Sequence, residues 1–383
     1  MTPPLPPRLH ALDNLRAIMM WLGVVLHVAA IHLAGPSPLP WRDEKRTAFA
    51  DVLVAFIHAF RMPVFFILAG FFVAWLVQRH GPAGMLRNRL RRLALPFAVF
   101  WPVLTLALGG AALLYLHRMA YGSWGLDLAL APPETRGAPN TMHLWFLWLL
   151  IWFGVLTRLA WRAGNRIYAR AGMLLRAIGA RAWGFAVLAV PPALVGMSYP
   201  NGFLVVDGSF LPSWTEWVHH GLFFVFGIVL FFHQQELFAY YQRRWPVLAA
   251  IGLAAFIATG VLLARGAGPL AVGYAYNCAT WAWSFAWIGL ALRVLASRRP
   301  LLAGMAESAY WVYLVHLPLT VLFGALLFGL PLPALVKIAL NIAATTLVCL
   351  ATYRWWVRSR WLGVLLNGRR DRGPGLPAAA SPG

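Results

Sequence analysis

The sequence predicts an all-α membrane protein, a polytopic bundle of about ten transmembrane helices with both termini in the cytoplasm. Composition is the first observation: 61% of the 383 residues are hydrophobic and 11% are charged, whereas soluble domains are about half apolar and about a quarter charged. The apolar residues gather in runs of about 20, the length that a spanning helix needs. The basic residues between these runs are the third observation, and they indicate the orientation.

Ten apolar runs are predicted as spanning helices, of which the fifth and sixth are short. Pro191 and Pro192 are expected to kink or break the fifth, because proline lacks the N–H that continues a helix. The predicted spans are Leu15–Ala34, Ala50–Val77, Leu93–Leu116, His143–Trp161, Ala182–Met197, Trp217–Phe232, Trp245–Ala264, Ala271–Leu295, Ala309–Leu330 and Ala334–Val357. The chain is thus divided into a cytoplasmic N-terminal segment (1–14), a transmembrane domain (15–357) and a largely disordered cytoplasmic tail (358–383).

The net charge of +21 comes mainly from loops between the predicted spans. With the N-terminus placed inside, 24 of the 32 basic residues lie on the inner side and six on the outer side, while Arg61 and Lys337 lie within spans. This asymmetry follows the positive-inside rule, so we expect the lipid bilayer as a partner and no nucleic acid. Cys278 and Cys349 both lie in apolar runs, which favours neither a disulfide framework nor a metal site.

The first predicted span carries ionisable side chains, which are costly in a membrane and by default mark function. Arg16 and His27 are 11 residues apart, so at about 100° per residue they share one helix face, separated by about 16 Å along the axis. Asp13 can pair with Arg16 at the i,i+3 spacing. A structural role is the alternative, with Arg16 as a topology anchor and His27 as a hydrogen-bonding packing residue.

The second predicted span carries His58 and Arg61, which are helical neighbours at i,i+3. Arg61 falls near the middle of the membrane and cannot easily reach water, so it needs a counter-charge, carbonyl groups, water or an anionic substrate. His143 opens the fourth span at the outer surface, and His316 lies within the ninth. Each of these residues could instead be structural.

Two loops are candidates for ligand contacts. Four arginines, among them Arg89 and Arg92, lie just before the third span. They could be a positive-inside signal alone, or they could bind phosphates through their guanidinium groups. On the outer side, segment 198–216 contains no Lys or Arg and carries side chains that suit sugar contacts. These are Asn201, Asp207, Trp214 and Glu216.

Taken together, these strings resemble a known family. Arg16-x10-His27 resembles the Arg/Lys-x10-His signature of the membrane acyltransferase-3 family, and RLRR at 89–92 resembles its Arg-x-x-Arg motif. The strings LDNLRA, LGVVLHVA, FIHAFRMPVFFILAGFF, MHLWFLW and ESAYWVYLVHLPLT resemble, in this order, one branch of the family, inner-membrane enzymes that succinylate periplasmic glucans. The resemblance runs in patches from about Leu12 to Pro318.

The resemblance implies a multi-pass O-acyltransferase of the bacterial inner membrane. Its co-substrate would be cytoplasmic acyl-CoA, with succinyl-CoA as the leading case, and its acceptor a periplasmic glucan or another glycan. It implies no tightly bound cofactor and no metal. His27 would be the catalytic histidine and Arg16 its motif partner. Further candidates fall at matching strings: His58, Arg61 and His316 for catalysis, Arg89 and Arg92 for donor binding, and Asp13 and His143 for substrate binding.

The chemistry of acyl transfer suits these residue types. A base must take the acceptor's hydroxyl proton, and a cation or donor must hold the developing oxyanion. Histidine titrates near neutral pH and suits the base, whereas Arg61 or His58 could hold the oxyanion or the free carboxylate of a succinyl donor. Two alternatives stay open: O-acetylation of another surface glycan, and transport of acyl groups or glucan without chemistry. The lack of a visible internal repeat counts mildly against a transporter.

Overall fold

The computed structural model describes residues 7–37, 39–132, 139–163, 165–297, 300–358 and 361–367. These residues are α-helical apart from short 3₁₀ and π-helical segments, loops and one isolated β-bridge, which confirms the all-α prediction. The main helices are α1 (Pro7–Ala30), α2 (Ala48–Arg89), α3 (Leu95–Tyr121), α4 (Trp145–Ala163), α5 (Asn165–Gly179), α6 (Gly184–Leu188), α7 (Val190–Gly196), α8 (Trp214–Phe232), α9 (Gln234–Ala264), α10 (Pro269–Val294), α11 (Pro300–Leu327), α12 (Ala334–Thr352) and α13 (Trp361–Asn367).

Seven helical stretches in the described part of the chain are long and apolar enough to cross a membrane, as expected of a multi-pass membrane protein. One is a 74-residue stretch, Ala48–Tyr121, in which α2 continues through the π-helix η1 (Leu90–Ala94) into α3. It contains two predicted spans. The eighth predicted span coincides with α10, which is not one of the seven stretches. The fifth predicted span corresponds to two short helices, α6 and α7. The count of ten and the sides of the termini therefore stay predictions.

Two interruptions lie at helix-breaking residues. Gly81 has φ 67° and ψ 169°, a conformation that only glycine adopts readily, and it kinks the long stretch just before Pro82. The predicted fifth span is divided at Ala189 into α6 and α7. Pro191 lies in the first turn of α7, where the missing N–H would have no helical partner. The expected break is thus confirmed.

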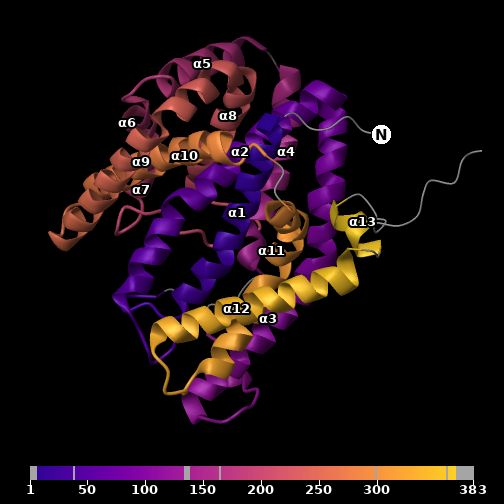
Figure 1. Cartoon of the computed structure of the whole chain (residues 1–383), viewed down its shortest axis with the longest axis vertical. Helices are drawn as coiled ribbons and strands as arrows, with labels where there is room; N and C mark the ends of the chain where they lie inside the picture. Colours follow the sequence, from indigo (N-terminus) through magenta and orange to yellow (C-terminus); the bar gives the residue numbers. More distant parts are fainter. Residues whose placement is uncertain are drawn as a thin grey trace, which may run out of the picture.

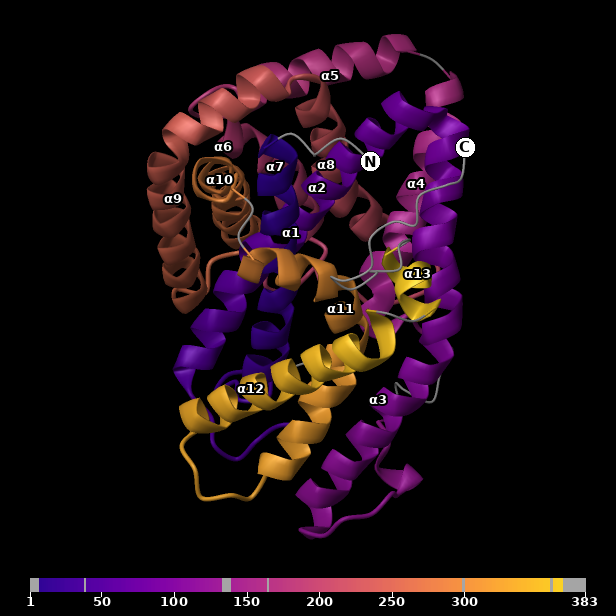
Figure 2. The ribbon, with the colours of Figure 1, turned by 45° about the vertical axis from the view of Figure 1, so that its right-hand side comes forward.

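The helices pack in pairs around α1 and α2 (Figure 1). α2 packs on α8, α1 on α11, and α10 on α9. α9 and α12 bury few of their side chains, so both present most of their surface outward. α12 crosses obliquely over α11, and α5 lies across one end of the bundle (Figure 2). The interior available for a site therefore lies among α1, α2, α8, α10 and α11.

Two glycines bring α2 and α8 into backbone contact. A Cβ on Gly70 would collide with the carbonyl oxygen of Phe224, and a Cβ on Gly227 would collide with that of Ile67. Small residues at such crossings let membrane helices approach closely. This contact holds together the segments of α2 and α8 that line the cavities described below.

Candidate active site

A cavity of about 70 Å³ lies between α1, α2 and α11, beside the 3₁₀ turn η4 (Met142–Leu144) that precedes α4. We term it the histidine cavity. Its lining includes five of the candidate residues from the sequence: His27, His58, Arg61, His143 and His316. Residues almost 300 positions apart in the chain are thus brought to one place.

The three rings of His27, His143 and His316 form a cluster. The His27 and His316 ring centroids are 5.2 Å apart, and those of His143 and His316 are 5.9 Å apart. His27 lies in the last turn of α1 and faces the interior of the bundle. None of the salt bridges formed by the described residues involves these rings, so each imidazole is oriented by something other than a carboxylate.

Backbone carbonyls fix the tautomers of two of these rings. His316 Nδ1 lies 2.9 Å from the oxygen of Val312 and 2.8 Å from that of Tyr313. His143 Nε2 lies 3.0 Å from the oxygen of Leu314. A carbonyl only accepts, so these nitrogens donate, and the other nitrogen of each neutral ring carries a lone pair. His316 Nε2 and His143 Nδ1 are buried without a protein partner, so each can accept a hydrogen bond from a ligand.

The turn that carries His143 is strained. Met142 has φ 49°, the left-handed region that residues other than glycine seldom adopt. The N–H and hydroxyl of Thr141 both donate to the oxygen of Gly208, at 2.7 and 2.8 Å. The hydroxyl of Tyr313 donates to the oxygen of His143 at 2.9 Å. Strained backbone of this kind persists only where surrounding contacts hold it, often at functional sites. Here the contacts of Thr141 and Tyr313 hold the turn and so position His143.

Arg61 is a buried cation that forms no salt bridge with any described residue. It is 6% exposed, its Nε donates to the oxygen of Met19 at 3.0 Å, and its guanidinium carbon lies 5.9 Å from the centre of the Phe65 ring. Gly23 makes room for it, since a Cβ there would collide with the guanidinium. The histidine cavity that it lines could therefore accept an anion, whose oxygens would take the remaining N–H groups.

A larger cavity of about 230 Å³, here the arginine cavity, adjoins the histidine cavity. Three predicted residues line it: Arg16, Arg89 and Arg92. Asp13 forms an ion pair of 3.0 Å with Arg16, as their spacing predicted. Arg89 Nη2 donates to a carbonyl of α2, but its Nε is buried without a protein partner. The two cavities share four lining residues, Met20, Phe65, Phe146 and Tyr313.

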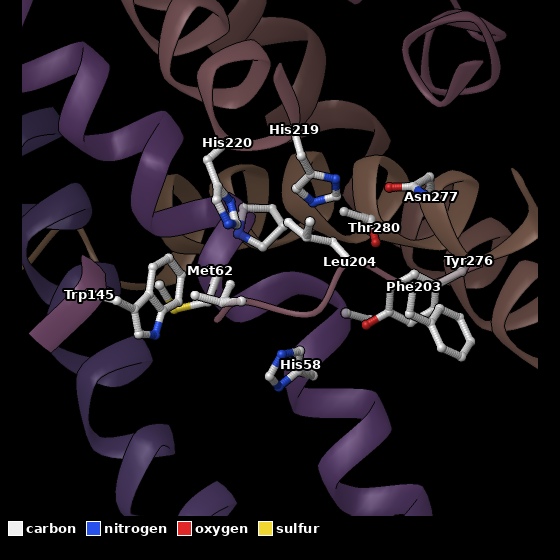
Figure 3. A pocket seen from close by; sticks show the side chains of 13 residues that line it. His58, Met62, Trp145, Phe203, Leu204, His219, His220, Tyr276, Asn277 and Thr280 are labelled. Atoms are coloured by element: carbon white, nitrogen blue, oxygen red, sulfur yellow. The ribbon is translucent and has the colours of Figure 1, made fainter. Parts of the chain in front are cut away.

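A third cavity, of about 60 Å³, lies on the other side of His58 (Figure 3). We term it the polar pocket. It shares three lining residues with the histidine cavity, His58, Met62 and Trp145. His58 remains exposed although protein surrounds it, because its ring projects into both spaces. The three cavities thus form a row, with cations at one end, the histidine cluster in the middle and the polar pocket at the other end.

Several lining residues were not among the site residues selected from the sequence, where His219 and His220 were interpreted as ordinary interface histidines. The polar pocket contains His219 and His220 of α8 and Asn277 and Thr280 of α10. Asn277 is a lone amide in the eighth predicted span, which was the available signal. Segment 198–216 does reach the pocket, but through apolar side chains at 203, 204 and 206. None of its four polar or aromatic candidates is among the residues that line the pocket.

The fold and the site define a multi-pass helical membrane protein with a polar, histidine-lined interior. The family model described as an acyltransferase domain, acyltransferase-3, matches residues 9–354, so the chain belongs to this family and is an acyltransferase. It is also similar to proteins named glucans biosynthesis protein C from Salmonella typhi and Salmonella typhimurium. Each is 27% identical over 341 residues, covering 83% of this chain and 84% of the relative. No solved structure matches the chain.

Proposed function

We propose that this protein transfers an acyl group, succinyl in the leading case, from cytoplasmic acyl-CoA to a hydroxyl of a periplasmic glucan, and that it lies in the bacterial inner membrane. The observation that carries the proposal is the row of cavities, in which an arginine-lined opening adjoins a cluster of three histidines and a buried arginine. The names of its relatives support glucan as the acceptor.

The donor would bind with its phosphates in the arginine cavity. Arg16, Arg89 and Arg92 provide a concentration of positive charge there, and guanidinium groups pair well with phosphate oxygens. The slender arm that ends in the thioester would then pass Tyr313 and enter the histidine cavity. The arginine cavity would then open to the cytoplasm, in keeping with the charge asymmetry of the loops.

In the proposed reaction, His27 accepts the proton of the acceptor hydroxyl while the hydroxyl oxygen attacks the thioester carbonyl carbon. Arg61 donates to the oxyanion that forms, or holds the distal carboxylate of a succinyl group. The tetrahedral intermediate then collapses with cleavage of the carbon–sulfur bond. The thiolate of CoA takes the proton from His27, so the products are an ester and free CoA. His316 and His58, which line the same cavity, would orient His27 and the reacting groups.

His27→Ala tests the proposal in purified protein supplied with acyl-CoA and a glucan. We expect a loss of about 10²–10⁴-fold in acceptor-dependent CoA release, the usual contribution of a general base, with normal insertion into the membrane. The matched control is His80→Ala, an exposed histidine of α2, which should retain activity. Full activity in a well-folded His27→Ala protein would refute His27 as the base.

Product analysis separates the proposal from its alternatives. Mass spectrometry of the glycan should find a succinyl increment rather than an acetyl increment if succinyl-CoA is the donor. Movement of glucan or acyl groups across proteoliposomes without release of CoA would instead indicate a transporter.

A further inference from the structure

The polar pocket concentrates unsatisfied polar atoms. Among the described residues, 13 buried side-chain nitrogens and oxygens lack a hydrogen-bond partner, and five of them belong to residues that line this one pocket. They are His219 Nδ1, both ring nitrogens of His220, Asn277 Oδ1 and Thr280 Oγ1. A buried polar atom without a hydrogen bond is costly, so a group of five in one pocket points to a ligand that supplies the missing partners.

The missing partners must include both donors and acceptors. A neutral imidazole has one N–H and one lone pair, a hydroxyl can do either, and an amide oxygen only accepts. Asn277 already donates its Nδ2 to the oxygen of Gly273 at 2.8 Å, which leaves Oδ1 for the pocket. The pocket's lining contains no Asp, Glu, Lys or Arg. Its chemistry therefore favours a neutral, polyhydroxylated group over an ion.

The walls of the pocket fit the same ligand class. Trp145, Phe203 and Tyr276 supply aromatic surface, and Figure 3 shows Phe203 and Tyr276 near Asn277 and Thr280. Binding pockets typically combine apolar walls with a few placed polar groups. The volume of about 60 Å³ is room for roughly four waters, or for the hydroxyl-bearing edge of one sugar ring.

The side chains of the pocket are held in place before any ligand arrives. The His220 ring stacks on Phe66, at 4.5 Å between centroids, and also contacts Trp145, at 5.2 Å. Phe66 and Trp145 contact each other at 6.2 Å, so the three rings form one cluster. Asn277 is tied to its own helix by the bond to Gly273. His58 stands where the pocket meets the histidine cavity. A hydroxyl bound here would thus lie beside the cavity that holds His27.

We propose that the polar pocket is the acceptor subsite, where His219, His220, Asn277 and Thr280 hold the hydroxyl-bearing edge of a single sugar unit and present it to the histidine cavity past His58. The assignment rests on the proposed function for its link to acyl transfer. The binding of a neutral sugar in the pocket stands on the unsatisfied atoms and the aromatic walls alone.

Thr280→Val and Asn277→Ala test the subsite in the full-length protein. With succinyl-CoA and a glucose oligosaccharide, we expect the KM for the oligosaccharide to rise about tenfold for each lost hydrogen bond. The KM for succinyl-CoA should stay unchanged, because the donor would bind in the arginine cavity. The matched control is Thr259→Val, since the Thr259 hydroxyl bonds within α9 at 2.8 Å and lies outside the pocket.

A binding measurement separates the two proposals. Titration calorimetry with the oligosaccharide alone should give a weaker Kd for Thr280→Val than for wild type or Thr259→Val. If Thr280→Val binds the oligosaccharide more weakly but the wild-type protein releases no CoA from succinyl-CoA, the subsite is supported and the proposed acyl transfer from acyl-CoA is refuted. If transfer occurs but both pocket variants keep the wild-type acceptor KM and Kd, the subsite assignment is wrong. Equal loss of donor and acceptor binding would mark the residues as structural and would also overturn it.

Discussion

Two buried cations in this protein have opposite surroundings. Lys337 of α12 is 0% exposed, and its Nζ lies 2.9 Å from both carboxylate oxygens of Asp43, itself 1% exposed. Arg61 of α2 is 6% exposed and forms no salt bridge with any described residue. The charge of Lys337 is neutralised by a carboxylate of the protein. Arg61 instead lines a cavity, and its partners are a backbone carbonyl and an aromatic ring.

The difference separates a structural charge from one that is open to a ligand. A buried charge is costly unless it is paired and hydrogen-bonded. The Lys337–Asp43 pair meets this condition and fastens α12 to the segment between α1 and α2. Arg61 would meet it only when an anionic group of a substrate enters the histidine cavity. Burial of a cation within a predicted span therefore does not by itself identify a site, and the partner decides.

Asp43→Ala should give the largest effect on stability. It leaves Lys337 buried without its carboxylate, and removal of one member of a buried pair typically costs about 3–5 kcal/mol. We expect a clear fall in the midpoint of thermal unfolding, followed by tryptophan fluorescence in detergent.

The double variant Asp43→Ala with Lys337→Met is the control for this prediction. It removes both charges and should recover most of the lost stability, because an apolar pair of similar volume often replaces a buried ion pair without penalty. An Asp43→Ala protein as stable as wild type would contradict the structural role of the pair.

The sequence predicted which residues are neighbours within one helix, but not which residues meet between helices that are distant in the chain. Arg16 and His27 share a face of α1 as helical periodicity required, and both line the row of cavities. Periodicity also made His58 a neighbour of Arg61. Periodicity does not show how the helices pack against one another. It therefore could not predict that His27 contacts His316, or that Lys337 pairs with Asp43, 294 positions away. The two cations therefore looked alike in the sequence.

Arg61→Met should have the next largest effect, and it should fall on activity. We expect kcat/KM for succinyl transfer to drop about 10²-fold, the typical loss of one donor to a developing oxyanion, with little change in the unfolding midpoint. Met matches the length of the arginine stem and leaves no carboxylate unpaired. The loss should be larger for succinyl-CoA than for acetyl-CoA if Arg61 holds the distal carboxylate, and equal for both if it holds the oxyanion.

One outcome would remove the distinction between the two cations. If Arg61→Met lowered the unfolding midpoint as much as Asp43→Ala does, while the folded fraction kept its kcat/KM, Arg61 would be a second structural charge. The histidine cavity would then lack its proposed anion partner.

The smallest effect should come from His32, which lies beside the paired cation. The first spanning helix ends at Ala30 rather than at the predicted Ala34, so His32 lies outside it. His32 is 1% exposed, and its Nδ1 donates to the oxygen of Lys45 at 2.8 Å. Burial lowers the pKa of His32 from its ordinary value of 6.5, and the positive charge of Lys337 lowers it further. The hydrogen bond to Lys45 and the charge of Asp43 raise this pKa, but by less than burial lowers it. The unfolded chain therefore binds a proton near pH 6.5 that the folded protein resists, so stability falls as the pH drops below 6.5 and is unaffected above it.

The measurement is the unfolding midpoint from pH 8 to pH 5.5 for wild type and His32→Gln. Because folding lowers the pKa of His32, His32→Gln should lose part of the decline in stability on the acid side. The exposed His80→Gln serves as control. Identical slopes for wild type and His32→Gln would mean that the segment around the Lys337–Asp43 pair opens to protons before the fold does. The surroundings of the Lys337–Asp43 pair would then be accessible to solvent, as the cavity around Arg61 is proposed to be accessible to a ligand, and burial would not distinguish the two cations.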